Sequence, residues 1–138
     1  MCESRTTGYA LKREVDLSYE AADRMIREEL LAQGFGVLTE IDVRETLKRK
    51  LDVDMPPYVI LGACNPSLAH RALQAEPDIG LLLPCNVVVR RDEAAGVTVV
   101  EAMDPVPMID MTGNEALWDV AQEARSRLET ALDRVAAG

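Results

Sequence analysis

The sequence predicts an α+β protein, a two-layer α/β sandwich in which amphipathic helices lie mainly on one face of a mixed sheet of about five strands. Apolar patterns typical of strands and helices follow one another as strand, helix, strand, helix, strand, helix, strand, strand, helix. The 138 residues, 48% of them hydrophobic, are enough for one domain with a core. Only 4% are aromatic, so aliphatic side chains and methionines must fill that core.

The first part of the chain predicts two strands, each followed by a helix. Residues 9–15 and 35–41 alternate loosely between apolar and polar side chains, as strands do. Ser18 is a favourable N-cap for a helix over 19–33, in which apolar residues recur at helical spacing. A capping-box pattern then predicts a short basic helix over 43–50.

The middle of the chain is its most apolar part. Residues 58–63 are bounded by proline and glycine, which is the pattern of a short buried central strand. Asn65 followed by proline predicts the N-cap and first residue of a helix over 66–75. Gly62 is interpreted as permitting close packing of the strand on that helix. The strand–helix–strand order makes the next strand, over 81–91, parallel to the first if the two share a sheet.

The last part predicts a hairpin and a long helix. Pro84 interrupts the strand over 81–91, so we expect a bulge or an edge there. Residues 92–96 form the hairpin loop, and 97–102 return as the antiparallel partner. After an irregular segment rich in methionine and proline, a clean amphipathic pattern predicts a helix over 115–136. Its apolar stripe comprises Leu117, Val120, Ala121, Ala124, Leu128, Leu132 and Val135.

Composition restricts the partners and the compartment. We expect a flexible N-terminus over residues 1–7 and a single domain over 8–138. The net charge of -9 argues against nucleic acid or an anionic membrane surface as a partner. No apolar run is long enough to span a membrane, and the start of the chain lacks the apolar segment of a secretory signal. Three cysteines without metal-finger spacing then predict free thiols in the cytoplasm.

Cys64 is the candidate reactive group. It lies between the end of a predicted strand and the start of a helix, where the helix dipole and free amides favour a thiolate. The neighbouring Asn65 can cap the helix or bind a ligand, but it cannot freely do both. The alternative is that Cys64 is a small buried hydrophobic residue and Asn65 only a cap.

A second Cys-Asn pair, Cys85 and Asn86, lies in an apolar strand. We interpret Asn86 as a buried amide that satisfies backbone groups left unpaired beside Pro84. In the parallel arrangement Cys64 and Cys85 lie about 15 Å apart, so we predict no disulfide between them. Asp104, before a proline, is a candidate to line a cleft.

The sequence assigns no metal ligands. His70 is expected on the helix surface, and with the cysteines it forms no zinc motif. Met103, Met108 and Met111 would suit a soft Cu(I) site together with a thiolate, although filling gaps in a core or dimer interface is the favoured interpretation. There is no phosphate-binding glycine loop or hydrolase motif.

The segments ILGACNPSLAHRAL and IGLLLPCNVVV, followed by a V-x-V strand and Asp104-Pro105, resemble the domain-of-unknown-function 302 family. The resemblance covers about residues 8–136. It implies a compact α/β fold and homodimers, and it implies no activity or cofactor. The positions that it marks are Gly62, Cys64, Asn65, Pro66, Leu83, Pro84, Cys85, Asn86 and Pro105.

Three functions remain open from the sequence. The first is a homodimeric protein that binds a small molecule or a soft metal in a pocket near Cys64, Asn65, Cys85, Asn86 and Asp104. The second is a thiol-dependent enzyme or redox sensor that uses Cys64. The third is an interaction domain in which both Cys-Asn pairs serve packing alone.

Overall fold

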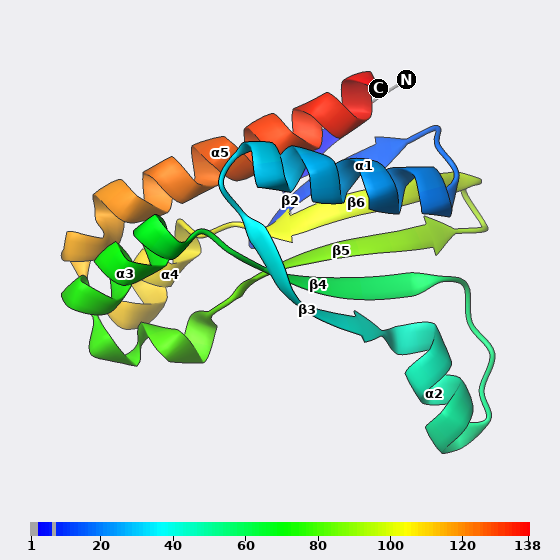
Figure 1. Ribbon diagram of the computed structural model, residues 1–138, viewed down its shortest axis with the longest axis horizontal. Helices are drawn as coiled ribbons and strands as arrows, with labels where there is room; N and C mark the ends of the chain where they lie inside the picture. Colours follow the sequence, from blue (N-terminus) through cyan, green and yellow to red (C-terminus); the bar gives the residue numbers. More distant parts are fainter. Residues whose placement is uncertain (1–2, 7) are drawn as a thin grey trace.

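The computed structural model describes residues 3–6 and 8–138 of the chain. The elements are β1 (Glu3–Thr6), β2 (Ala10–Val15), α1 (Tyr19–Ala32), β3 (Gly36–Asp42), α2 (Val43–Leu51), β4 (Tyr58–Cys64), α3 (Pro66–Ala75), the 3-10 helix η1 (Pro77–Leu82), β5 (Cys85–Asp92), β6 (Val97–Met103), α4 (Pro107–Thr112), the 3-10 helix η2 (Glu115–Leu117) and α5 (Trp118–Ala137). The strands form one sheet in the order β1-β2-β6-β5-β4-β3. Helices α1 and α5 lie side by side across one face of this sheet, and α2 projects away from it (Figure 1).

The predicted α+β class with helices on one face is confirmed, but the predicted mixed sheet is wrong. Every pairing between the described strands is antiparallel, including that of β4 with β5. The expected parallel crossover fails because residues 81–82 complete η1 instead of starting a strand. The chain therefore enters β5 beside the end of β4 and runs back along it. Pro84 precedes β5 and causes no bulge inside it.

The core lies between the sheet and the pair α1 and α5. Leu11, Ala102, Val87 and Leu61 form one row of partners across β2, β6, β5 and β4, and all four are buried. Each fully buried Leu or Val contributes roughly 1.5–3 kcal/mol to folding. The buried helix residues that pack on such rows are Ala22, Ile26 and Leu30 of α1 and Val120, Ala121, Ala124, Leu128, Ala131, Leu132 and Val135 of α5.

An ion pair between a buried arginine and an exposed aspartate joins the sheet to α5. Arg13 on β2 is 4% exposed, and its guanidinium lies 2.9 Å from the carboxylate of Asp133 on α5. The Arg13 stem faces the core, because the residues two positions before and two positions after it in β2 are buried and point to the same face of the sheet. Loss of the carboxylate would leave a desolvated cation, so this pair fixes α5 over β2.

Local signals set most helix ends where the sequence predicts them. Ser18 accepts a hydrogen bond from the Ala21 amide at the start of α1, and Asp42 does the same for Glu45 at the start of α2. Gly34 follows α1 with φ 86°, a left-handed conformation that glycine adopts without strain. The irregular segment expected before the last helix contains α4, which begins at Pro107 and ends at Thr112, followed by Gly113 with φ 66°.

Two expectations concern the N-terminus and membranes. Of the predicted flexible stretch 1–7, residues 1, 2 and 7 lie outside the described residues, and Glu3–Thr6 pairs with β2 as β1. Cys2 therefore also lies outside the described part. No helix in that part has the length and apolar character needed to cross a bilayer.

Candidate functional site

An apolar pocket lies at the end of the sheet where β4 finishes and β5 begins. Its volume is about 370 Å³, which is within the usual range of small-molecule sites. We call it the cysteine pocket, because Cys64 and Cys85 both line it. The other lining residues are Phe35, Leu38, Thr39, Ala63, Asn65, Leu68, Ala69, Ala72, Leu73, Leu83, Pro84, Pro105, Met108, Leu117, Val120, Ala121 and Ala124.

Antiparallel pairing brings the two cysteines together. Ala63 is the partner of Cys85 in the register of β4 and β5, and Cys64 is the next residue after Ala63. This geometry puts the two cysteine Cα atoms about 6 Å apart, so the predicted separation of about 15 Å is wrong. The error follows directly from the strand direction. Both thiols are free in the structure, but the ground for predicting no disulfide is lost, because a separation of about 6 Å is within the range that a disulfide can bridge.

The two thiols differ in their surroundings. Cys64 is half-buried, at the last position of β4, whereas Cys85 is 8% exposed. Burial, with a smaller contribution from the neighbouring Cys64, raises the pKa of the Cys85 thiol to about 11. Cys85 is therefore a neutral thiol at pH 7. Cys64 is the more accessible of the two thiols.

Asn65 has its predicted place and a structural role there. Its side-chain oxygen accepts a hydrogen bond from the Leu68 amide at 3.3 Å and so caps α3. Its amide nitrogen donates to the carbonyl oxygen of Gln33, also at 3.3 Å, and joins α3 to the end of α1. Both ends of the amide are thus engaged. Asn65 lines the pocket mainly as a wall.

Gly62 permits Thr39 and Pro84 to approach the backbone of β4 closely. A Cβ added at Gly62 would lie 2.9 Å from Cγ of Pro84 and in still closer contact with the hydroxyl of Thr39. Both neighbours line the cysteine pocket. The sequence-based interpretation that Gly62 serves packing against the next helix is therefore wrong, since its close neighbours are a strand residue and a proline.

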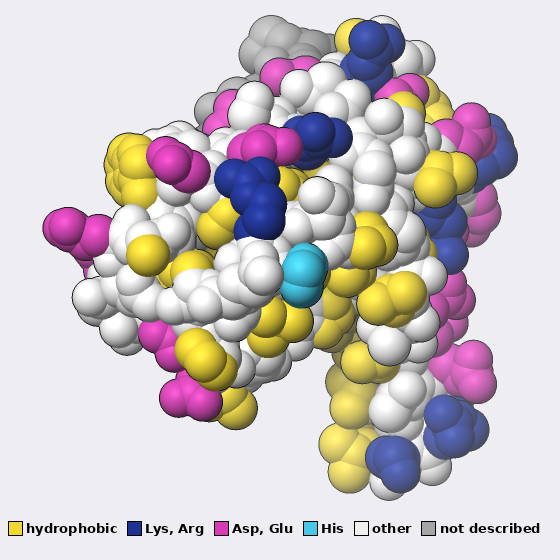
Figure 2. Space-filling view, turned by 60° about the vertical axis from the view of Figure 1, so that its left-hand side comes forward, with side chains coloured by type: hydrophobic (Ala, Val, Ile, Leu, Met, Phe, Trp, Pro, Cys, Tyr) yellow, Lys and Arg dark blue, Asp and Glu magenta, His cyan; other side chains and the backbone are white. Residues whose placement is uncertain are grey.

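Three other residues singled out from the sequence lie outside the pocket lining. Asn86 pairs with Gly62 and is exposed, so it is not the buried amide that the sequence suggested. Asp104 is 5% exposed, accepts a hydrogen bond from the Val106 amide at 2.9 Å and lies 3.7 Å from Arg125. It thus fixes the turn before α4. His70 is exposed on α3, as expected, and is the cyan side chain in Figure 2.

Small side chains on the helices leave the pocket empty. Ala69 and Ala72 on α3 line it together with Ala121 and Ala124 on α5, and Met108 of α4 lines it from a third helix. Sequence reasoning found these residues only as members of helical stripes. Their shared cavity depends on how α3 and α5 are placed, and a periodic pattern does not contain that information.

Three sulfur-containing side chains line the pocket. Within residues 3–6 and 8–138, no group of three His, Cys, Asp or Glu side chains could hold a metal ion. Met108 lines the pocket together with both cysteines, whereas Met111 is 69% exposed. The lining therefore offers two thiols and one thioether, ligands that soft ions prefer.

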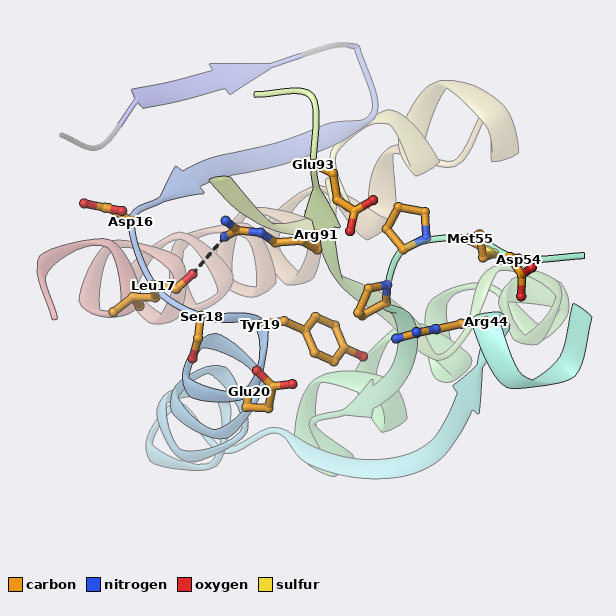
Figure 3. A pocket seen from close by; sticks show the side chains of 12 residues that line it. Asp16, Leu17, Ser18, Tyr19, Glu20, Arg44, Asp54, Met55, Arg91 and Glu93 are labelled. Atoms are coloured by element: carbon orange, nitrogen blue, oxygen red, sulfur yellow. Dashed lines mark hydrogen bonds between the residues drawn. The ribbon is translucent and has the colours of Figure 1, made fainter. Parts of the chain in front are cut away.

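A second, larger cleft lies at the opposite end of β4. It has a volume of about 780 Å³, is open to solvent and is shown in Figure 3. Arg44 and Arg91 line it together with four carboxylates, so charges of both signs are mixed. Arg91 is held by the Leu17 carbonyl and the Thr98 hydroxyl. Burial and nearby carboxylates raise the pKa of Tyr19 in this cleft to about 12, so its hydroxyl stays protonated.

Comparison with known proteins identifies the family. The sequence matches the domain of unknown function DUF302 over residues 11–135. The chain belongs to the DUF302 family. A solved structure titled as an uncharacterized conserved DUF302 protein from Bacillus stearothermophilus is 32% identical in sequence, with a TM-score of 0.85. That similarity covers 93% of this chain and 98% of the other, so the DUF302 fold accounts for nearly all of both.

No curated protein matches this DUF302 chain. The resemblance inferred from the two Cys-Asn segments is confirmed, and both segments fall inside the matched range. In this DUF302 fold the first segment supplies the end of β4 and α3, and the second supplies η1 and β5. These two segments therefore supply two walls of the cysteine pocket.

Proposed function

We propose that this DUF302 protein binds a small apolar molecule in the cysteine pocket and acts as a homodimer. The observation that carries the proposal is a cavity of about 370 Å³ lined almost wholly by apolar side chains, into which elements from both halves of the chain converge. An apolar pocket of this kind suits compact hydrocarbons and aromatic molecules.

The polar groups restrict the ligand further. Asn65 is already engaged at both ends, so Cys64, Cys85 and the exposed hydroxyl of Thr39 remain to contact a ligand. None of these carries a charge when the thiols are protonated. A charged group inside the pocket would lose its hydration without a counter-ion, which costs several kcal/mol. We therefore expect an uncharged ligand with one weak hydrogen-bonding group at most.

A matched pair of substitutions tests this proposal. Ala69→Phe places a ring from α3 into the pocket, whereas Ala137→Phe adds the same ring at an exposed position of α5. Indole and toluene, titrated by calorimetry into the wild-type protein, should bind with dissociation constants of about 0.1–1 mM, as expected of fragments with few atoms. Ala69→Phe should weaken that binding at least about tenfold and Ala137→Phe should not. Equal binding by both variants would refute the pocket.

A second candidate function is thiol chemistry at Cys64. The observation that favours it is a half-buried thiol at the end of β4, two residues before α3 begins, with the protonated thiol of Cys85 about one register step away. Alkylation with iodoacetamide across pH, followed by mass spectrometry, tests it. A native Cys64 that reacts only after unfolding would remove this candidate. An inert Cys64 together with no binding of apolar probes would leave a purely structural interaction domain.

A further inference from the structure

Four segments that are far apart in the sequence meet at the larger cleft, the one drawn in Figure 3. We call it the charged cleft. It is lined by residues 16–20 before and at the start of α1, by Arg44 of α2, by residues 54–57 between α2 and β4, and by Arg91 and Glu93 at and just after the end of β5. Its volume of about 780 Å³ lies within the range of sites that hold small molecules. The charged cleft is separate from the cysteine pocket, since the two share no lining residue.

Arg91 joins three of these segments and so gives the cleft a fixed shape. Its backbone amide donates to the carbonyl oxygen of Pro57 at 3.0 Å. Its side chain donates to the carbonyl oxygen of Leu17 at 3.4 Å, the dashed contact in Figure 3, and to the hydroxyl of the buried Thr98 at 3.1 Å. Pro56 and Pro57, which form one wall, have restricted backbones. A ligand would therefore meet a preformed site.

Arg44 is a cation in an unfavourable position of its own helix. It is the second residue of α2, where the positive end of the helix dipole repels a basic side chain. The other basic residues of α2, Lys48, Arg49 and Lys50, lie in the last turn, where the dipole favours them. The Arg44 side chain is exposed and has no hydrogen bond or ion pair in the described part of the chain. Helix stability therefore does not account for Arg44, and a residue that breaks a local rule is expected at a functional site.

The hydroxyl of Tyr19 is a second unused donor in the cleft. In Figure 3 the Tyr19 hydroxyl and the Arg44 guanidinium point toward one another. Tyr19 is the first residue of α1 and is half-buried, and within residues 3–6 and 8–138 its hydroxyl has no hydrogen-bond partner. Because burial raises the pKa of Tyr19 to about 12, the hydroxyl is a donor at neutral pH. Arg44 and Tyr19 together present N–H and O–H donors to an anionic group placed between them.

Acidic side chains at the cleft restrict the ligand further. Asp16, Glu20 and Glu93 are exposed and have no ion pair among the described residues. The fourth carboxylate, Asp54, pairs with Lys48. A simple anion would be attracted by the arginines and repelled by the carboxylates, and a simple cation would meet the reverse. A molecule with both charges can place each one beside its opposite, so the cleft suits a zwitterion better than an ion of either sign.

We propose that the charged cleft binds a small zwitterion of the amino-acid type, which is a free amino acid or a short peptide. Its carboxylate accepts hydrogen bonds from Arg44 and Tyr19. Its ammonium group lies beside the carboxylate of Glu93, which extends toward the cleft in Figure 3. The two sources share this chemistry and differ in length, since an amino acid carries both charges on one carbon and an extended tripeptide carries them roughly 10 Å apart.

NMR titration of the isotopically labelled full chain tests the site with matched probes. Glycine and triglycine carry both charges, N-acetylglycine carries only the carboxylate, and glycinamide carries only the ammonium group. At least one of the two zwitterions should shift the amide signals of residues 17–20 saturably, with a dissociation constant of about 0.1–10 mM. N-acetylglycine and glycinamide should bind at least about tenfold more weakly than that zwitterion. The zwitterion that binds more tightly identifies the source, an amino acid or a peptide.

Three substitutions assign the charges. Arg44→Gln should weaken binding of the zwitterion at least about tenfold. Arg49→Gln is the matched control and should leave binding unchanged, because Arg49 is an exposed arginine of the same helix that lies outside the cleft. Glu93→Gln should weaken the zwitterion by about three- to tenfold and strengthen the binding of N-acetylglycine. All three positions are exposed, so the variants should fold, and thermal denaturation checks that.

Three results would overturn this inference. The first is that neither glycine nor triglycine shifts the signals of residues 17–20. The second is that a probe with a single charge binds as tightly as the zwitterions, which would make the cleft a plain anion or cation site. The third is equal binding by Arg44→Gln and Arg49→Gln. None of these results bears on the cysteine pocket, which the apolar probes test separately.

Discussion

Substitution of Gly62 by alanine tests the packing that shapes the cysteine pocket. The new Cβ would lie 2.9 Å from Cγ of Pro84 and closer still to the hydroxyl of Thr39. Thr39 is exposed and can turn its side chain away, but the proline ring is fixed by its backbone. The strain at Pro84 therefore remains.

The expected loss of stability is about 1–2 kcal/mol. Overpacking of this kind costs about 1–3 kcal/mol, and the lower entropy of the unfolded alanine chain offsets about 0.4–1 kcal/mol of it. Gly36→Ala is a matched control on the adjacent strand, because a Cβ at Gly36 meets no atom within 4 Å. It should leave stability unchanged or raise it by less than about 1 kcal/mol.

Urea unfolding of both variants measures the difference at equilibrium. The double variant Gly62→Ala with Thr39→Ala should recover only part of the loss, because the contact with Pro84 persists. If Gly62→Ala proved as stable as Gly36→Ala, the close approach of Thr39 and Pro84 over Gly62 would not describe the protein in solution.

Three further predictions concern single side chains. Asn65→Ala should destabilise the protein by about 1–3 kcal/mol, because α3 loses its cap and the Gln33 carbonyl keeps only its second donor, Arg127. The exposed Asn86→Ala should change the unfolding free energy by less than about 0.5 kcal/mol, and equal losses would contradict the cap. Asp104→Ala should cost about 1–2 kcal/mol in urea unfolding, since the Val106 amide loses its acceptor; an unchanged midpoint would exclude this role. Because burial raises the pKa of Cys85 in the folded protein from 9.0 to about 11, the thiol of the unfolded chain ionises first as the pH rises. The difference in unfolding free energy between wild type and Cys85→Ala should therefore be constant below pH 9 and fall by up to about 2–3 kcal/mol toward pH 11. A difference that does not change with pH would refute the burial of this thiol.

Local chemistry made the helices predictable from the sequence. Ser18, Asp42 and Asn65 each cap the helix that they were expected to start, because a side-chain oxygen three residues before a free amide is a short-range signal. The stripe of α5 was also visible, since six of its seven predicted apolar positions lie on the buried face of α5, and the seventh, Leu117, is buried at the end of η2.

Strand direction was not predictable in the same way. The residues after α3 form η1, a short helix that consumes six positions and turns the chain before Cys85. A run such as residues 81–83 is apolar in either a strand or a 3-10 helix, so its pattern does not separate them. The predicted distance between Cys64 and Cys85 failed for this reason alone.

The pocket could not be predicted from the sequence for a similar reason, because its shape depends on how elements far apart in the chain are placed. Cys64 and Asn65 were found because they lie at a strand-to-helix junction. The alanines of α3 and α5 became pocket walls only through the packing of two helices far apart in the chain. Asn86 and Asp104 were chosen as polar residues in apolar or irregular contexts, and the structure gives one an exposed position and the other a turn to stabilise.

Methyl NMR of the protein titrated with indole tests the central claim, a ligand site at the cysteine pocket, most directly. The account predicts saturable shifts of the methyl signals of Ala72, Leu73, Met108 and Ala121, which line the pocket from three helices. The exposed Leu81 methyls should not move. Shifts confined to exposed residues, or none at the pocket at millimolar probe, would contradict the account.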